Sequence, residues 1–249
     1  MTEPVDAIRT TGVCRAGAAV FVVLAGGSGT RVGSDRNKVY LPMAGRPVIS
    51  WSLSWAADVV EIGRVVLVIR PEDEEAAAEA IAAAGLGRSG KPVEVITGGS
   101  TRHRSEQAAL DHLAEAIGAG AIDVVAIHDG ARPLAGPLLL QEVIRAAAAH
   151  GGAVPTVSEQ RAWPVDAEGR LRPPDTDHGL HRVQTPQAFR AAPLLAAYAA
   201  ALREGVEGTD TSAALEGRAD LQVVAVPGRA DNLKVTFAED LRRAETLLS

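Results

Sequence analysis

The sequence predicts an α/β fold in which a mostly parallel β-sheet is covered by helices on both faces. Three observations support this class. Short apolar runs alternate along the chain with longer segments of helical spacing, and most connections between them are short. The apolar runs are nearly continuous, which is typical of strands buried on both faces. A length of 249 residues lies in the range of one large α/β domain.

The expected strands are short runs rich in Val, Ile and Leu. They cover residues 20–24, 64–69, 93–97, 124–127, 153–157 and 221–226. Helices are expected where apolar residues recur every three or four positions, or where Glu and Ala dominate. They cover residues 47–60, 71–84, 102–117, 137–149, 191–203 and 237–248. Candidate caps for one further short helix are Thr209, Asp210, Thr211 and Ser212.

Two segments depart from this alternation. Residues 1–18 carry no periodicity, so we expect a loose N-terminal tail followed by a single domain over residues 19–249. Residues 156–186 contain several prolines and scattered charges, without a clear helix or buried strand. Because compact domains seldom hold about 20 or more unstructured residues, we interpret this segment as a hairpin arm that reaches a second subunit.

Composition argues against several classes of partner. The net charge of −6 and the pI near 5.6 disfavour binding to nucleic acid or to a membrane surface, because both kinds of binding require a basic patch. The single cysteine, Cys14, excludes an internal disulfide framework and a multi-cysteine metal site. The N-terminus lacks an apolar signal region, and no long apolar run is present. The sequence therefore predicts a cytoplasmic protein with a small-molecule partner.

The first strand leads into the strongest functional signal of the chain. It is followed by the segment Ala25-Gly26-Gly27-Ser28-Gly29-Thr30, in which a ligand can lie against the backbone and amide groups can converge on an anion. Turn chemistry alone also selects such glycines. Arg31 and Lys38 favour a functional interpretation, because a guanidinium and an amine would both reach a polyphosphate held by the glycines.

Two common phosphate loops do not fit this segment. A dinucleotide-binding fingerprint would need a glycine where Val32 stands, which disfavours a nicotinamide dehydrogenase. A Walker loop would need Ser or Thr after Lys38, where the chain has Val39.

Two other loops also follow predicted strands. They cover residues 98–104 and 128–133, and they contain most of the remaining polar residues at strand ends. In open α/β sheets, ligands bind beyond the carboxyl ends of the strands. One cleft is therefore expected to collect residues 26–38 together with both of these loops.

Five motifs occur in order along the chain. They are LAGGSGTRVG followed by Lys38, GGSTRHRS at 98–105, HDGARP at 128–133, VQTPQAF at 183–189 and GRADNLKVT at 228–236. With these motifs the chain resembles the 2-C-methyl-D-erythritol 4-phosphate cytidylyltransferases of isoprenoid precursor synthesis, and more widely the polyol- and sugar-phosphate nucleotidyltransferases. The resemblance implies a Rossmann-like nucleotidyltransferase sheet with a β-hairpin arm for dimerisation.

The resemblance also implies a reaction. The phosphate of a small polyol attacks the α-phosphorus of CTP and expels pyrophosphate, which requires in-line positioning and neutralisation of charge. Arg31 and Lys38 would be the catalytic residues. A Mg²⁺ ion, or another divalent cation, would bridge the triphosphate oxygens, and its protein ligands stay open. The expected partners are CTP, a polyol phosphate and a second copy of the chain.

The remaining site residues follow from the same resemblance. The nucleotide would be bound by Ala25, Gly26, Gly27, Gly29, Gly99, Ser100, Arg102 and Ser105. The acceptor would be bound by Asp129, Arg132, Thr185 and Lys234. Two alternatives stay open: Arg102 as a capping or surface arginine at a helix start, and Asp129 with Arg132 as a structural bridge that closes a turn. His128 is expected to be a packed histidine at a strand end.

Three departures from the family pattern lie near the acceptor side. Asn37 replaces a usual proline, Ser158-Glu159 replaces an Asp-Thr pair, and Asp177 replaces an arginine expected to reach the acceptor phosphate. An aspartate there would repel a phosphate, although Arg182, His178 or His181 are candidate replacements. Two alternatives therefore remain: a cytidylyltransferase for another polyol phosphate, such as ribitol 5-phosphate, and a non-catalytic nucleotide-binding homologue.

Overall fold

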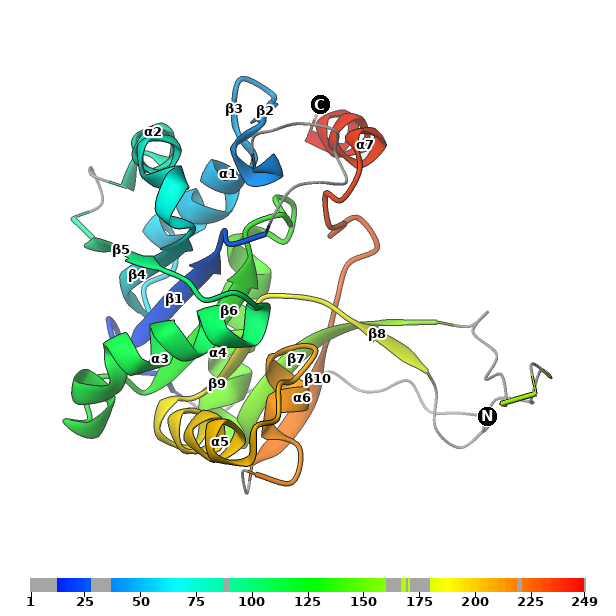
Figure 1. The fold of residues 1–249 in the computed structure, drawn as a ribbon. Helices are drawn as coiled ribbons and strands as arrows, with labels where there is room; N and C mark the ends of the chain where they lie inside the picture. Colours follow the sequence, from blue (N-terminus) through cyan, green and yellow to red (C-terminus); the bar gives the residue numbers. More distant parts are fainter. Residues whose placement is uncertain are drawn as a thin grey trace.

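A computed structural model describes residues 13–27, 37–86, 90–159, 167–168, 170, 180–218 and 221–248. Its centre is a sheet of eight strands (Figure 1). These are β1 (Ala19–Leu24), β4 (Ile62–Ile69), β5 (Val93–Thr97), β6 (Val124–Asp129), β7 (Gly151–Ser158), β8 (His181–Val183), β9 (Gln187–Arg190) and β10 (Gln222–Pro227). The order is β10-β7-β9-β6-β1-β4-β5, and β8 pairs with β7. A small separate hairpin consists of β2 (Pro42–Met43) and β3 (Arg46–Pro47).

The sheet is mostly parallel, as predicted. β1 pairs in parallel with both β4 and β6, β5 adds to β4, and β10 adds to β7. The prediction missed β9, which lies antiparallel between β6 and β7. This strand has only four residues and overlaps the end of the VQTPQAF motif, so its apolar run is too short to indicate a strand.

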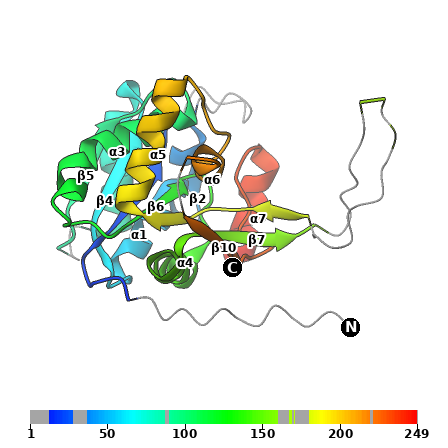
Figure 2. The same cartoon turned by 90° about the horizontal axis from the view of Figure 1, so that it is seen from below.

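Helices cover both faces of the sheet (Figure 2). They are α1 (Val48–Ser54), α2 (Glu74–Ala84), α3 (Arg102–Gly118), α4 (Gly136–His150), α5 (Ala191–Glu204), α6 (Thr211–Leu215) and α7 (Ala238–Leu248). Side chains along β1 alternate between two cores, because successive residues of a strand point to opposite faces. Phe21 and Val23 pack with α1, α2 and α4, whereas Val20 and Val22 pack with α3, α5 and α6. α7 packs apart from these cores, where Ala244 lies against Met43 of the small hairpin.

Two predicted boundaries change. The helix expected over residues 47–60 is α1 alone, and a tight 3-10 turn over Trp55–Ala57 follows it. The expected loose tail ends before residue 18, because Cys14 is buried and Arg15 forms an ion pair with Asp123 at 2.6 Å. Residues 1–12, which belong to the same prediction, lie outside the described residues. No helix in the described part of the chain combines the length and apolarity that a membrane crossing requires.

The predicted arm begins as an antiparallel ribbon of β7 and β8. Thr156 pairs with Val183 and Ser158 with His181, and the amide of Glu159 donates a hydrogen bond to Leu180 O at 2.8 Å. Both views show this ribbon leaving the body of the molecule (Figures 1 and 2). The rest of the excursion lies outside the described residues, apart from residues 167–168 and 170.

The parallel strands place several loops at one edge. Leu24 at the end of β1 pairs with Asp129 at the end of β6 and with Val68 near the end of β4. Thr97 at the end of β5 pairs with Ile69. The segments that follow these strands therefore meet at a shared edge, as expected for a ligand site in such a sheet.

Candidate active site

A cavity of about 480 Å³ opens at this carboxyl edge. Its lining combines small residues, hydroxyls and cations from loops that are distant in sequence. The lining residues are Leu24, Gly26, Gly27, Lys38, Val39, Ser100, Thr101, Arg102, Ser105, Asp129, Gly130, Ala131, Lys234 and Thr236. All three loops that the sequence assigned to one cleft contribute to this cavity.

The glycine loop leaves the cavity open at Gly27. A Cβ atom added to Gly27 would meet nothing within 4 Å, and its φ lies outside the left-handed region that favours glycine. Neither turn geometry nor packing among the described residues therefore requires glycine at this position. The absence of a side chain at Gly27 leaves space in the cavity, and this favours the functional interpretation of the loop.

Ala25, which was predicted to contact the nucleotide through its backbone, uses both backbone polar groups within the protein. Its N–H donates to Val68 O at 2.8 Å, and its carbonyl oxygen accepts a hydrogen bond from the Asn37 side chain at 2.5 Å. Ala25 is also almost fully buried, and it does not line the cavity. Its role is to anchor the loop, because both backbone groups are used inside the protein.

Asn37 fixes the backbone next to Lys38. The Asn37 side chain is 1% exposed, and its Nδ2 donates to Ala25 O and, at 3.0 Å, to Asp73 Oδ2. Asp73 in turn accepts two hydrogen bonds from Arg70, each at 2.8 Å. Burial opposes the charge of Asp73, but Arg70 and Asn37 outweigh it and lower the pKa of the carboxyl. This buried cluster ties Lys38 to the end of β1, and no sequence pattern links its members.

The second loop is shaped by Ser105. The Ser105 hydroxyl accepts a hydrogen bond from the Gly99 amide at 3.2 Å and lies 2.9 Å from the Thr101 carbonyl oxygen, to which it donates. Gly99 needs to be glycine, because a Cβ there would lie 2.3 Å from the Cβ of Arg104. Ser100 and Thr101 are thereby held in the cavity wall. Ser105 lines the cavity too, while Gly99 supports the loop from behind.

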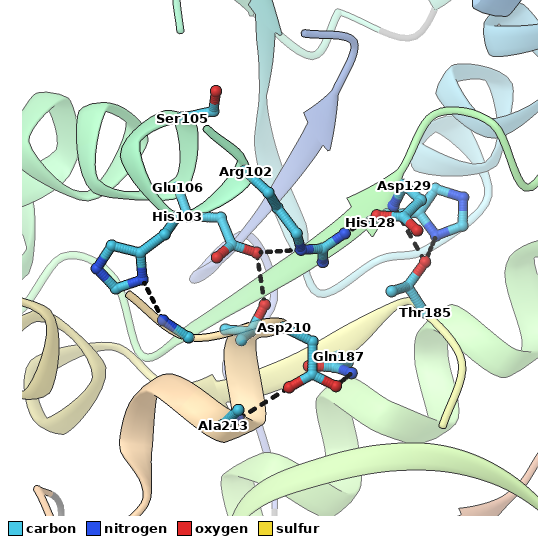
Figure 3. A network of polar contacts seen from close by, with 12 residues as sticks. Arg102, His103, Ser105, Glu106, His128, Asp129, Thr185, Gln187, Asp210 and Ala213 are labelled. Carbon is cyan, nitrogen blue, oxygen red and sulfur yellow. Dashed lines mark hydrogen bonds and ion pairs between the residues drawn. The ribbon is translucent and has the colours of Figure 1, made fainter. Parts of the chain in front are cut away.

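Arg102 spans the two halves of the site. It is the first residue of α3, yet its guanidinium reaches across to Asp129 at the end of β6, with which it forms an ion pair (Figure 3). Its Nη2 is buried and finds no hydrogen-bond partner among the described residues. A surface or capping role does not fit this burial. Nε also lacks a hydrogen-bond partner among the described residues, although Arg102 as a whole lines the cavity.

Asp129 gathers cations from three parts of the chain. Lys234 Nζ lies 2.8 Å from Asp129 Oδ2, and Arg132 Nε lies 3.7 Å from the same oxygen, in addition to the Arg102 contact. Burial opposes the charge of Asp129, but Arg102 and Lys234 outweigh it and hold the pKa of this carboxyl far below its usual range. Arg132 is partly used elsewhere, because its Nη1 donates to Asn232 O at 2.8 Å.

Thr185 lies beneath Asp129 and is 4% exposed. His128 is fully buried, as expected for a packed histidine, and burial lowers its pKa to about 3, so the ring is neutral. The Nε2 atom of His128 lies 3.1 Å from the Arg132 carbonyl oxygen. Because a carbonyl oxygen can only accept, Nε2 carries the ring proton, and Nδ1 accepts a hydrogen bond from the Thr185 hydroxyl at 3.0 Å. The Thr185 hydroxyl in turn accepts a hydrogen bond from the Asp129 amide at 3.0 Å (Figure 3). The single proton of Thr185 is therefore used within the protein.

The predicted site residues divide into three groups. Those that line the cavity are Gly26, Gly27, Lys38, Ser100, Arg102, Ser105, Asp129 and Lys234. Those that support it from behind are Ala25, Gly99, Arg132 and Thr185. Arg31 and Gly29 lie outside the described residues. Sequence reasoning noted Asn37 only as a departure from the family pattern and missed the buried partners Asp73 and Glu106, since only their burial distinguishes them from surface residues.

The side chains that line the cavity show how many protein ligands a metal ion could find there. Within the described ranges, no group of three His, Cys, Asp or Glu side chains is placed to hold one. Asp129 is the carboxylate that the described lining offers, and its oxygens already contact Arg102 and Lys234. Magnesium usually keeps several waters and binds one or two carboxylates together with substrate phosphates. A Mg²⁺ ion at this site would therefore have to be held mainly by triphosphate oxygens and water.

The fold and this site define a nucleotidyltransferase of the α/β class. The model of the 2-C-methyl-D-erythritol 4-phosphate cytidylyltransferase family matches residues 19–249. The chain is 40% identical over 228 residues to the enzyme of that name from Cereibacter sphaeroides strain KD131, which covers 92% of this chain and 96% of the relative. It therefore belongs to the 2-C-methyl-D-erythritol 4-phosphate cytidylyltransferase family.

Solved structures agree with this assignment. The 4-diphosphocytidyl-2C-methyl-D-erythritol synthase of Anaerococcus prevotii superposes with a TM-score of 0.78 at 26% identity, covering 92% of this chain and 97% of that one. The 2-C-methyl-D-erythritol 4-phosphate cytidylyltransferase of Thermus thermophilus superposes with a TM-score of 0.68 at 27% identity, covering 91% and 97%. The arrangement of the sheet and its covering helices is thus shared with both proteins.

Gly27→Ala should weaken nucleotide binding without harming the fold. The added methyl enters the cavity, and overpacking of about 1–3 kcal/mol corresponds to a loss of CTP affinity of about ten- to a hundredfold. The free energy of unfolding should stay equal or rise by up to about 1 kcal/mol. Isothermal titration with CTP and urea unfolding measure the two effects.

Gly118→Ala is the matched control. Gly118 also has open space where an added methyl would lie and no left-handed φ, but it is at the exposed end of α3. Its CTP affinity should equal that of the wild type. Equal CTP affinity in the Gly27→Ala variant would contradict the role assigned to the open space at this glycine.

Proposed function

We propose that this chain transfers CMP from CTP to the phosphate of 2-C-methyl-D-erythritol 4-phosphate and releases pyrophosphate. The observation that carries the proposal is the 40% identity, over nearly the whole length of both chains, to a relative named for this activity. The cavity supports it, because its lining offers an open glycine loop and converging cations for a triphosphate and a second phosphate.

The chemistry needs little covalent help from the protein. An oxygen of the acceptor phosphate attacks the α-phosphorus of CTP, a new P–O bond forms, and the bond to the bridging oxygen of the β-phosphate breaks. Negative charge grows on the transferred group and on the departing pyrophosphate, so fixed cations accelerate the step. Lys38 lines the cavity for this role, and we propose that Arg31 is its catalytic partner.

The nucleotide half of the site is assigned to the first two loops. Gly26 and Gly27 leave room for the triphosphate, and Ser100 and Ser105 lie in the wall where a pyrimidine edge can be read. We propose that Gly29, which lies outside the described residues, binds the triphosphate with them. A Mg²⁺ ion, or another divalent cation, would neutralise part of the triphosphate charge when bound. Its ligands would be mainly phosphate oxygens and water, because both oxygens of Asp129 already contact cations.

The acceptor half is assigned to Asp129 and Lys234, which lie together at the cavity wall. Arg132 contributes charge from behind, and Thr185 fixes the backbone amide of Asp129. Burial lowers the pKa of Arg132, Asp129 opposes this, and Arg102 and Arg182 of β8 lower the pKa further. We propose that Arg182 contacts the acceptor phosphate, because Asp177 stands where the family has an arginine for this contact. Asp177 and His178 lie outside the described residues.

We further propose that residues 19–249 act as one domain within a cytoplasmic homodimer. The ribbon of β7 and β8 supports the dimer, because its described part leaves the body and ends in exposed residues. Extended arms of this kind bury their polar backbone most readily against a second copy of the chain.

Pyrophosphate release from CTP tests the proposed function. The wild type should release pyrophosphate only when Mg²⁺ and 2-C-methyl-D-erythritol 4-phosphate are both present. Lys38→Met should lower kcat by about 10²–10³-fold, as for loss of a preorganised donor to the transition state, while the fold is retained. Lys38→Arg keeps the charge but changes its geometry, and should recover only part of the rate.

The outcome with other acceptors separates the alternatives. Faster turnover with ribitol 5-phosphate would replace the proposed acceptor. CTP binding without pyrophosphate release from any acceptor would instead indicate a non-catalytic homologue. Wild-type turnover by Lys38→Met would contradict the assigned role of this lysine.

The mass in solution tests the homodimer. Sedimentation equilibrium should give twice the mass of 25.8 kDa. Replacing residues 159–180 by a short Gly-Ser turn should shift the protein toward the monomer, with the helical circular-dichroism signal retained. A monomeric wild type at micromolar concentration would contradict the proposed role of the arm.

A further inference from the structure

Glu106 is a fully buried carboxylate outside the cavity. It lies in α3 one helical turn after Arg102, and it is 0% exposed. A buried carboxylate is costly unless it is paired and hydrogen-bonded. It does not line the cavity, so it is not placed to contact a ligand.

Three side chains satisfy Glu106. Arg102 Nε lies 3.1 Å from Glu106 Oε1, and the Thr211 hydroxyl donates to the same oxygen at 2.7 Å. The Tyr198 hydroxyl donates to Oε2 at 2.5 Å. Burial raises the pKa of Glu106, while Arg102 and the two hydroxyls oppose that rise. The carboxylate thus joins α3 to α5 and α6 at the point where Arg102 departs toward the cavity.

Arg102 is held between two carboxylates. Its guanidinium pairs with Glu106 on one side and with Asp129 on the other, as Figure 3 shows. Burial opposes the charge of Arg102, but both carboxylates outweigh it and raise its pKa. Ion pairs on two sides of a planar guanidinium restrict its orientation. Nε and Nη2 of Arg102 are both buried without a hydrogen-bond partner among the described residues, so the contact with Glu106 is an ion pair rather than a hydrogen bond.

We propose that Glu106 is a positioning residue for the nucleotidyl-transfer reaction. Glu106 acts through Arg102, and Tyr198 and Thr211 hold Glu106 in place. The proposal rests on the proposed function. Without the Glu106 charge, Arg102 keeps a single carboxylate partner and its long side chain can leave the reactive geometry. A misplacement of about 1 Å near the reacting groups can cost about a hundredfold in rate.

Glu106→Gln tests the charge while keeping the shape. The amide can still accept a hydrogen bond from a hydroxyl, so the fold should be retained. We expect kcat to fall by up to about a hundredfold, with a smaller change in KM for CTP. Glu61→Gln is the matched control, because Glu61 is another buried carboxylate, and it pairs with Arg145 and Gln141 outside the cavity lining. It should keep kcat within about fivefold of the wild type.

A double-mutant cycle with Arg102→Ala separates positioning from a purely structural role. If Glu106 acts through Arg102, the double variant should have the same kcat as Arg102→Ala alone. An additive loss would overturn the proposal, as would wild-type kcat in Glu106→Gln. If Glu106→Gln does not fold, Thr211→Val takes its place in the same cycle, since Thr211 bonds the oxygen that faces Arg102.

Assays of the wild-type enzyme distinguish a failure of the proposed function from a failure of the role proposed for Glu106. No turnover by the wild type with any acceptor would contradict the proposed function. Normal wild-type turnover with an unaffected Glu106→Gln variant would contradict only the role of Glu106.

Discussion

The site depends on one buried carboxylate that must be surrounded by cations. Asp129 ends the central strand β6 with 7% of its surface exposed, where an unpaired charge would be strongly unfavourable. Arg102 from the nucleotide-side loop and Lys234 from the segment before α7 both pair with it. These residues are far apart in the sequence, so their pairing with one carboxylate brings the predicted nucleotide and acceptor halves into a single cavity.

Buried polar residues behind the cavity hold the cations of its lining in place. Lys38 follows Asn37, whose amide is fixed by Ala25 and Asp73, and Arg102 is backed by Glu106. This arrangement suits phosphoryl-type chemistry, in which most of the rate comes from charges that are already oriented when the substrate binds. These residues also explain a departure from the family pattern. Where the family has a proline whose ring restricts the backbone, this chain has Asn37, whose side-chain hydrogen bonds fix the backbone instead.

The sequence predicts most of the sheet and the location of the cavity, because buried parallel strands are local apolar runs and their loops must share one edge. It does not predict β9, whose four residues form a strand only through pairing with β6 and β7. The spacing of Arg102 and Glu106 is visible in the sequence, but four-residue spacing on a helix usually indicates an exposed pair. The motif predicts that Ala25 contacts the ligand, but a motif locates a loop without showing that its backbone groups are bonded within the protein.

The most direct test of the central role of Asp129 compares CTP affinity with turnover in an Asp129→Asn variant. This change keeps the shape of the side chain and removes the charge that gathers Arg102 and Lys234. Our account predicts that kcat falls by about a hundredfold or more, because the cations lose their common partner and their alignment, while the Kd for CTP changes by less than about tenfold. A variant that turns over CTP at the wild-type rate would contradict it.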